Sequence, residues 1–245
     1  MVDKIKVVAD NNIPFLKGVL EPYVDICYLN PSEIFNNNVK DVDALIIRTR
    51  TICNKKLLEG TKIKFIATAT IGFDHIDIEY CKNNNITWIN APGCNSSSVM
   101  QYIASALVTI SKKKGINLSK SAIGIIGVGN VGSKVANLSR SLGMKVLLND
   151  PPRMREERNT DFIEIDELIA ESNIISFHVP LTKQGIYKTY HMFDEKFVSK
   201  INKGKILLNT SRGSVVKTAV LKNALKVIIF NTLCIENEFY KNTKK

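Results

Sequence analysis

The 245-residue chain contains no apolar run long enough to cross a membrane, and its cysteines form no C-x-x-C pair. A membrane-spanning helix needs about 20 consecutive apolar residues. The five cysteines are scattered along the chain, so we expect reduced thiols in the cytoplasm, and neither a disulfide framework nor a metal site. The amino terminus passes directly into the strand-like stretch Lys4–Val8, so we expect no signal peptide.

Acidic residues are in deficit, because 34 lysines and arginines face 23 aspartates and glutamates, a net charge of +11. A large positive charge can indicate binding to nucleic acid or to an anionic membrane. Here the lysines are dispersed, the longest basic run is Lys112–Lys114, and no aromatic residues interleave with a basic stripe. We therefore expect solvated surfaces without a nucleic-acid or membrane partner. A charged cleft that attracts an anionic substrate fits the composition equally well.

A glycine-rich turn lies between an apolar strand and an amphipathic helix. Ile123–Ile126 predicts a buried strand, and Gly127, Gly129 and Gly132 then complete a G-x-G-x-x-G spacing. In a dinucleotide site the first glycine permits the turn, the second lets the backbone approach a pyrophosphate, and the third lets helix and strand pack closely. The free N–H groups and the dipole of the helix start also favour phosphate.

The next strand supplies an acid where a dinucleotide site needs one. Lys145–Asn149 predicts a strand that ends at Asp150, about 20 residues after the glycines. A carboxylate there accepts hydrogen bonds from the ribose hydroxyls and repels a 2′-phosphate, so we predict NAD as the cofactor, and not NADP. The alternative is a ligand-free turn with Asp150 as an ordinary strand-end cap. We expect the following charged segment, Arg153–Asp161, to be a solvated loop, with Arg153 near the cofactor edge.

Short apolar runs alternate with helical patterns throughout, which predicts an α/β fold. We expect two doubly wound parallel-sheet units of the Rossmann or flavodoxin-like kind, joined by a long helix. The predicted divisions are an incomplete substrate domain at 1–94, a connecting helix within 95–117, an NAD-binding domain at 118–225 and a divergent tail at 226–245. In the first unit the predicted strands are Lys4–Ala9, Asp25–Leu29, Ala44–Ile47, Phe65–Ala67 and Thr87–Ile89, and the predicted helices are Pro14–Leu20, Pro31–Phe35, Lys55–Leu58 and Asp77–Asn84.

Polar loops follow several of the predicted strands, where ligands of parallel sheets bind. Arg48 and Arg50 follow one strand and suit a carboxylate or a phosphate, although they also suit a plain surface. Thr70 follows the next strand, in a loop that also contains His75. We interpret His75 as a capping or packing residue and not as a catalytic base.

Together these residues resemble the D-isomer-specific 2-hydroxyacid dehydrogenases, over about Val7 to Leu225. The A-P-G-C-N and D-P-P-R stretches are narrower than the glycine motif, and they resemble the branch of this family that acts on 4-phospho-D-erythronate. The stretches that carry the resemblance are Arg48–Thr49, Ala67–Thr70, Ala91–Asn95, Gly124–Gly132, Asp150–Arg153, Phe177–Leu181 and Asn209–Gly213.

The resemblance implies roles for individual residues. The substrate would touch residues of the first unit, and NAD would touch the turn, the acid and the later strand ends of the second. Arg212 would be the catalytic arginine, whose forked guanidinium grips the substrate carboxylate and the C2 oxygen. The implied substrate residues are Arg48, Thr49 and Thr70, and the implied cofactor residues are Gly127, Gly129, Asn130, Val131, Gly132, Asp150, Val179, Thr210, Ser211 and Arg212.

The implied reaction is the oxidation of 4-phospho-D-erythronate to 2-oxo-3-hydroxy-4-phosphobutanoate, with NAD as hydride acceptor, in pyridoxal phosphate synthesis. The implied partner is therefore a small phosphorylated hydroxy acid, and longer relatives are expected to be homodimers. Two alternatives remain open. One is another D-2-hydroxyacid dehydrogenase, of the 3-phosphoglycerate type, and the other is a non-catalytic NAD-binding remnant.

The chain departs from the family pattern after Arg212. The family's base is a histidine that follows this arginine and pairs with a carboxylate, whereas His75, His178 and His191 all precede it. By the resemblance, Glu238 would be the paired carboxylate and is the second candidate catalytic residue, although Leu233 and Phe239 depart from the pattern and Glu238 also suits a solvated tail. We interpret the tail as a truncated or frameshifted form, and we expect weak NAD binding and turnover slowed by about 10²–10⁴-fold.

Overall fold

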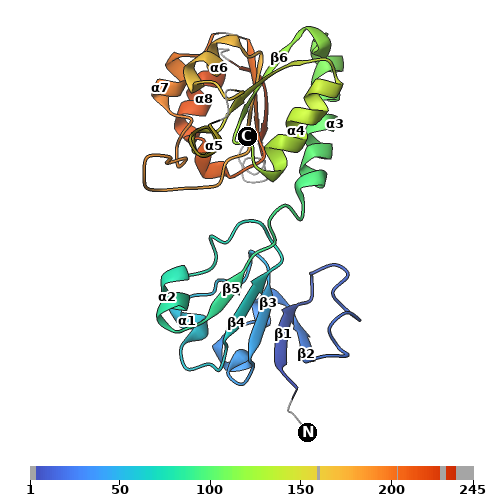
Figure 1. Ribbon diagram of the computed structural model, residues 1–245, viewed down its shortest axis with the longest axis vertical. Helices are drawn as coiled ribbons and strands as arrows, with labels where there is room; N and C mark the ends of the chain where they lie inside the picture. Colours follow the sequence, from blue (N-terminus) through green and yellow to red (C-terminus); the bar gives the residue numbers. More distant parts are fainter. Residues whose placement is uncertain (1–3, 159–160, 203, 227–229, 236–245) are drawn as a thin grey trace. The chain divides into compact units, whose positions relative to one another are not determined.

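The computed structural model describes residues 4–158, 161–202, 204–226 and 230–235. The chain divides into two compact units, the first ending at Asn95 and the second beginning at Ser96. Each unit contains a five-stranded parallel sheet with helices (Figure 1). The expected α/β class with two parallel-sheet units is thus confirmed. Within the described ranges, no helix is long and apolar enough to span a membrane.

The first sheet reverses its winding direction next to β1. Its strands lie in the order β2-β1-β3-β4-β5, and every neighbouring pair is parallel. Ligands of such sheets bind where the winding reverses, which here is between β1 and β3. The elements are β1 (Lys6–Asp10), β2 (Asp25–Leu29), β3 (Ala44–Ile47), α1 (Lys55–Leu58), β4 (Phe65–Thr68), α2 (Ile78–Asn83) and β5 (Thr87–Ile89), with 3-10 turns η1 (Pro31–Glu33) and η2 (Asn36–Val39).

The second sheet reverses between β6 and β8. Its order is β10-β9-β8-β6-β7, again with every neighbouring pair parallel. The elements are α3 (Ser96–Lys114), η3 (Leu118–Lys120), β6 (Ala122–Ile126), α4 (Asn130–Ser141), β7 (Lys145–Asn149), α5 (Pro151–Glu157), α6 (Ile165–Glu171), β8 (Ile174–Phe177), α7 (Glu195–Ser199), β9 (Lys205–Asn209), η4 (Gly213–Val215), α8 (Thr218–Lys226) and β10 (Phe230–Ile235).

Helices cover both faces of the second sheet. In Figure 1, α3 and α4 lie on one face and α6, α7 and α8 lie on the other. Leu107 and Val135 belong to a buried core with Ile125, and Leu168 belongs to a second buried core with Phe177. Every residue of β6, β8 and β9 is buried. Because both faces are covered, these strands are mostly apolar and do not alternate, and their polar members Ser176, Lys205 and Asn209 are also buried.

Two expectations about local structure are wrong. Pro14–Leu20 forms turns instead of a helix, and Phe15 (φ 62°) and Gly18 (φ 86°) have left-handed backbones that a helix cannot contain. The segment expected as a solvated loop from Arg153 begins instead within helix α5. Asp150 caps this helix, and a proline occupies its first turn, where a missing N–H costs nothing.

Two further differences concern element length and the tail. The helix expected at Pro31–Phe35 is only the single 3-10 turn η1, Pro31–Glu33, because it ends at Ile34, whose backbone is not helical. Part of the tail is the regular strand β10, which pairs in parallel with β9. The second sheet therefore extends into the segment expected as a divergent tail, because Phe230–Ile235 pairs with β9.

Candidate functional site

The turn after β6 accepts only glycine at two of its positions. Gly127 has φ +87°, and a Cβ there would lie 2.7 Å from the His178 carbonyl oxygen and 2.8 Å from Val179 Cγ1. A Cβ on Gly132 would lie 2.0 Å from the Gly127 carbonyl oxygen. The carboxyl ends of β6 and β8 and the start of α4 therefore meet at a distance that a side chain would prevent.

Gly129 differs, because a Cβ there would meet nothing within 4 Å. Packing does not require this glycine, so its missing side chain keeps open the space before α4. The first residues of this 12-residue helix, Asn130, Val131 and Gly132, carry backbone N–H groups without partners inside the helix. An open approach to these donors at the positive end of a helix fits a pyrophosphate.

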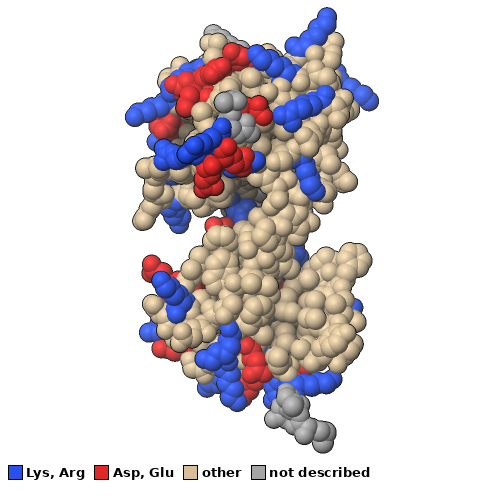
Figure 2. All heavy atoms as spheres, in the orientation of Figure 1, with Lys and Arg blue, Asp and Glu red and all other residues tan. Residues whose placement is uncertain are grey.

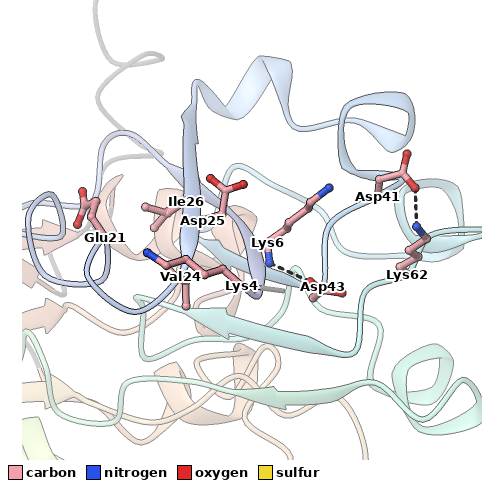
Figure 3. A pocket seen from close by; sticks show the side chains of 9 residues that line it. All are labelled: Lys4, Lys6, Glu21, Val24, Asp25, Ile26, Asp41, Asp43 and Lys62. Carbon is pink, nitrogen blue, oxygen red and sulfur yellow. Dashed lines mark hydrogen bonds and ion pairs between the residues drawn. The ribbon is translucent and has the colours of Figure 1, made fainter. Parts of the chain in front are cut away.

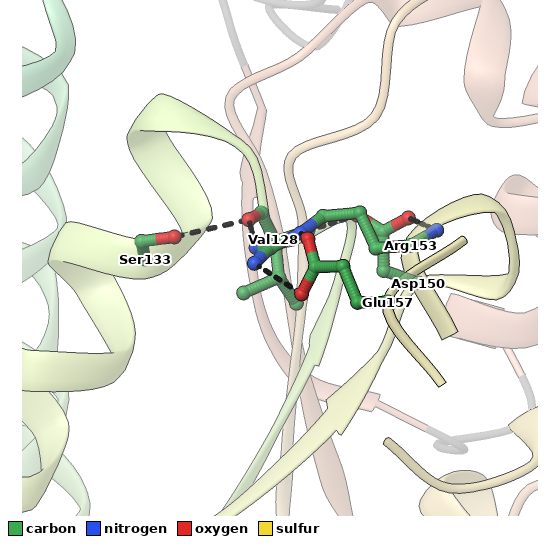
Figure 4. Close-up of polar contacts among 5 residues, drawn as sticks. All are labelled: Val128, Ser133, Asp150, Arg153 and Glu157. Carbon is green, nitrogen blue, oxygen red and sulfur yellow. Dashed lines mark hydrogen bonds and ion pairs between the residues drawn. The ribbon is translucent and has the colours of Figure 1, made fainter. Parts of the chain in front are cut away.

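Three side chains hold the peptide groups of Val128 within this turn (Figure 4). Val128 N–H donates to Asp150 Oδ2 at 2.8 Å, and Ser133 Oγ donates to the Val128 carbonyl at 3.0 Å. Arg153 Nη1 also donates to that carbonyl. Asp150 Oδ1 accepts from Arg153 N–H at 3.2 Å, which caps α5. Because a carboxylate offers about four acceptor positions, these two bonds leave others on Asp150 open.

His178, directly after β8, has a hydrogen bond at each ring nitrogen. Nε2 lies 2.8 Å from Ser176 Oγ, and Nδ1 lies 3.1 Å from Thr210 Oγ1. Burial lowers the pKa of His178 to about 4, so the ring is neutral near pH 7. A neutral imidazole whose two ring nitrogens are both hydrogen-bonded is a poor general base. Its evident role is to hold Thr210, one of the residues expected beside the nicotinamide.

Asn209 shapes the loop that carries Ser211 and Arg212. Its Oδ1 accepts from Ser211 N–H at 3.0 Å and from Ser211 Oγ at 2.7 Å, while its Nδ2 donates to the Arg212 carbonyl at 2.9 Å. Arg212 is half-buried, and its Nη1 donates to the Ser211 carbonyl at 3.0 Å. We did not single out Asn209 from the sequence. The available signal was an amide side chain that ends a wholly buried strand.

In the first unit, the candidate substrate residues follow the carboxyl ends of two neighbouring strands. Arg48 and Thr49 are exposed after β3, and Arg48 Nη1 donates to the Asn12 carbonyl at 3.1 Å across the reversal between β1 and β3. Thr70 is half-buried after β4. The structure thus places all three at the carboxyl end of this sheet, which in parallel sheets generally is where ligands bind.

Thr68 connects the Thr70 loop to His75. Thr68 Oγ1 lies 2.7 Å from Thr70 Oγ1 and 3.0 Å from His75 Nε2, and Thr70 Oγ1 donates to the Gly72 carbonyl at 2.9 Å. His75 is buried, which agrees with its interpretation as a packing residue. Glu238, the second candidate catalytic residue, lies outside the described residues.

A hollow of about 770 Å³ in the first unit is not part of this candidate site (Figure 3). It lies at the amino ends of β1 and β2, whereas the candidate residues follow carboxyl ends. Its lining mixes both signs of charge. Lys62 pairs with Asp41 at 2.9 Å, and the backbone N–H of Lys6 donates to Asp43 Oδ2 at 2.8 Å.

Charges of both signs are interspersed over each unit on the face shown in Figure 2. Several lysines in the second unit pair with acids, among them Lys145 with Glu171 at 2.5 Å and Lys217 with Glu195 at 2.7 Å. On that face no continuous basic stripe accompanies the charge of +11. Binding of nucleic acid therefore gains no support from this face.

Comparisons with known proteins identify the family. The model of the D-isomer specific 2-hydroxyacid dehydrogenase NAD-binding domain matches residues 99–231. Erythronate-4-phosphate dehydrogenase of Bacteroides fragilis is 50% identical over 233 residues, which are 95% of this chain and 67% of that protein. The enzyme of the same name from Porphyromonas gingivalis is 41% identical over 223 residues, which are 91% of this chain and 60% of that protein.

Solved structures share the fold. D-lactate dehydrogenase from Aquifex aeolicus, complexed with NAD and lactic acid, has a TM-score of 0.78 and 29% identity, over 95% of this chain and 77% of that one. The NAD⁺-bound 3-phosphoglycerate dehydrogenase of Entamoeba histolytica has a TM-score of 0.81 at 24% identity, over 98% of this chain and 84% of that one. With its glycine turn and strand-end acid, this chain belongs to the D-isomer-specific 2-hydroxyacid dehydrogenase family, and its second unit contains the NAD-binding domain.

Proposed function

We propose that the chain acts on 4-phospho-D-erythronate and oxidises its C2 hydroxyl to the 2-oxo acid with NAD. The observation that carries this proposal is the 50% identity, over 95% of the chain, to a relative named erythronate-4-phosphate dehydrogenase. A substrate of the 3-phosphoglycerate type has weaker support, because the solved 3-phosphoglycerate dehydrogenase shares only 24% identity.

We assign NAD to the turn after β6. The backbone N–H groups of Asn130 and Val131 would hold the pyrophosphate over Gly129, and the Asp150 carboxylate would accept from the ribose hydroxyls. Thr210, held by His178, would border the nicotinamide together with Val179 and Ser211. When bound, NAD supplies the hydride acceptor.

Charge directs the assignment of the substrate groups. The guanidinium of Arg212 matches a carboxylate in a two-pronged geometry, and the Asn209 hydrogen bonds orient the loop that carries it. In the first unit, Arg48, Thr49 and Thr70 supply a cation and hydroxyls at the carboxyl ends of their strands. We assign these three to the phosphorylated part of the substrate.

The proposed oxidation also needs a general base to remove the hydroxyl proton, and these residues supply no evident one. No histidine follows Arg212 in the 245 residues, and His178 has a pKa of about 4 with both ring nitrogens engaged. We therefore propose that these 245 residues bind NAD and, by themselves, turn over about 10²–10⁴-fold more slowly than an enzyme with a positioned base. The side chains of Cys27, Cys53, Cys81 and Cys94 are free thiols, which fits a cytoplasmic location.

The test has two parts. Calorimetry with NAD measures binding, and the release of NADH is followed with 4-phospho-D-erythronate and with 3-phosphoglycerate. We expect NAD binding and slow turnover with 4-phospho-D-erythronate, and still less turnover in Arg212→Lys, which keeps the charge but loses the fork. Binding without any turnover would identify a non-catalytic NAD-binding chain. Faster turnover of 3-phosphoglycerate would reassign the substrate.

A further inference from the structure

The corner after β7 contains two side chains of the kinds that favour opposite nicotinamide cofactors, an acid and an arginine. An acid at this strand end favours the free ribose hydroxyl of NAD, whereas a nearby arginine accommodates the 2′-phosphate of NADP. Asp150 and Arg153 are only three residues apart, on the same side of the turn (Figure 4). The local sequence alone therefore does not decide between the cofactors. The choice depends on which group binds the guanidinium of Arg153.

Glu157 occupies it. Arg153 Nε donates to Glu157 Oε1 at 2.6 Å, and Arg153 Nη2 donates to Glu157 Oε2 at 3.0 Å. The third nitrogen, Nη1, donates to the Val128 carbonyl, and the guanidinium carbon lies 5.4 Å from the centroid of the Phe162 ring. Every nitrogen of the guanidinium therefore has a partner, and the fork that would grip a phosphate is closed by a carboxylate.

The pKa values of the pair shift in the directions that such an ion pair requires. The hydrogen bond with Glu157 raises the pKa of Arg153, and the same bond lowers the pKa of Glu157. At neutral pH both groups are charged, so Asp150, Arg153 and Glu157 together carry one net negative charge. A 2′-phosphate, with a charge near −2, would be repelled by this corner.

We propose that Glu157 is a specificity-determining residue that excludes NADP by occupying the Arg153 guanidinium. The inference rests on the proposed placement of NAD at Asp150. Removing the Glu157 charge frees Nε and Nη2 of Arg153 for a phosphate, while the Nη1 bond to Val128 still holds the side chain at the turn. The side chains of Arg153 and Glu157 are 36% and 42% exposed, so their pair contributes little to folding, and its removal tests recognition.

The experiment measures dissociation constants of NAD and NADP for the 245-residue chain and for three variants. Glu157→Gln removes the charge with little change of shape. Glu156→Gln removes the same charge one residue away on α5 and serves as the matched control. Arg153→Ala combined with Glu157→Gln removes the group that would receive the phosphate.

We expect Glu157→Gln to bind NADP about tenfold more tightly, with NAD affinity within about twofold of the parent chain, because a phosphate gains charge-assisted bonds to a freed arginine. The control should keep the parent ratio of the two affinities, and the double variant should lose the gain.

An unchanged ratio in Glu157→Gln, while the parent chain binds NAD, would overturn the role of Glu157 and leave the proposed function intact. An equal gain in Glu156→Gln, or a gain that survives in the double variant, would also overturn it. If the parent chain binds neither nucleotide, the proposed cofactor site fails, and this inference fails with it.

Discussion

The carboxylate of Asp150 accepts a 2.8 Å hydrogen bond from the backbone N–H of Val128, which lies 22 residues earlier in the glycine turn. One side chain thus ends β7, caps α5 and holds the turn after β6. The residue expected to select the cofactor is therefore also a structural part of the turn that would bind it.

Asp150→Asn should weaken NAD binding about tenfold, because the neutral amide accepts less strongly from the ribose hydroxyls and has only one oxygen for Val128 and Arg153. Calorimetry with NAD measures the effect. Asp166→Asn is the matched control, since Asp166 pairs with Lys200 on an exposed surface of the same unit. Equal NAD affinity in Asp150→Asn and the parent chain would remove Asp150 from the cofactor site.

Two glycines of the turn should respond oppositely to alanine. In Gly129→Ala the new Cβ meets nothing within 4 Å, so stability should be retained while NAD binding is lost. In Gly132→Ala the Cβ would lie 2.0 Å from the Gly127 carbonyl oxygen, so the free energy of unfolding should fall by about 1–3 kcal/mol. Urea denaturation and calorimetry on both variants separate the effects. Normal NAD binding by a folded Gly129→Ala variant would contradict the pyrophosphate assignment.

His178 should make stability depend on pH. Burial lowers its pKa from 6.5 to about 4, so between these values the unfolded chain binds the proton more tightly. Its contribution is full above pH 6.5 and is lost as pH falls toward 4. Between pH 7 and 4.5, the parent chain should lose about 2 kcal/mol more unfolding free energy than His178→Gln.

Urea denaturation at the two pH values measures this difference. His191→Asn is the control, because it removes a different histidine and asparagine tolerates the left-handed backbone there, φ 55°. If His178→Gln loses as much stability as the parent chain on acidification, the His178 ring is not the source of the pH dependence.

Lys205 should be a stabilising cap of α6. Its buried ammonium donates to the carbonyls of Ile169 at 2.5 Å, of Ala170 at 3.2 Å and of Ser172, at the negative end of the helix. Lys205→Met should lower the free energy of unfolding by about 1–3 kcal/mol, because three carbonyls lose a charged donor. Lys200→Met, which breaks only an exposed pair with Asp166, should change it by less than about 1 kcal/mol in urea denaturation. Equal losses in the two variants would show that burial of Lys205 adds nothing.

Strands were the most predictable part of this fold. Asp25–Leu29, Ala44–Ile47, Thr87–Ile89 and Lys145–Asn149 have the bounds expected from the sequence. Each is a short apolar or β-branched run, and polar or turn-forming residues at its ends interrupt the pattern. The helix expected at Pro14–Leu20 was wrong. Its apolar spacing suits a helix, but its backbone turns at Phe15 and Gly18.

The sequence by itself determined the α/β class, the glycine turn, the acid that follows it and the family, because all of these depend on residues close together along the chain. Only the tertiary structure decided that Glu157 closes the Arg153 fork over Val128, that His178 is neutral and holds Thr210, and that Asn209 shapes the Arg212 loop. These contacts arise where the parallel pairing of β6 with β7 and β8 aligns the strand ends. Burial and hydrogen-bond geometry there depend on neighbours that no local pattern specifies.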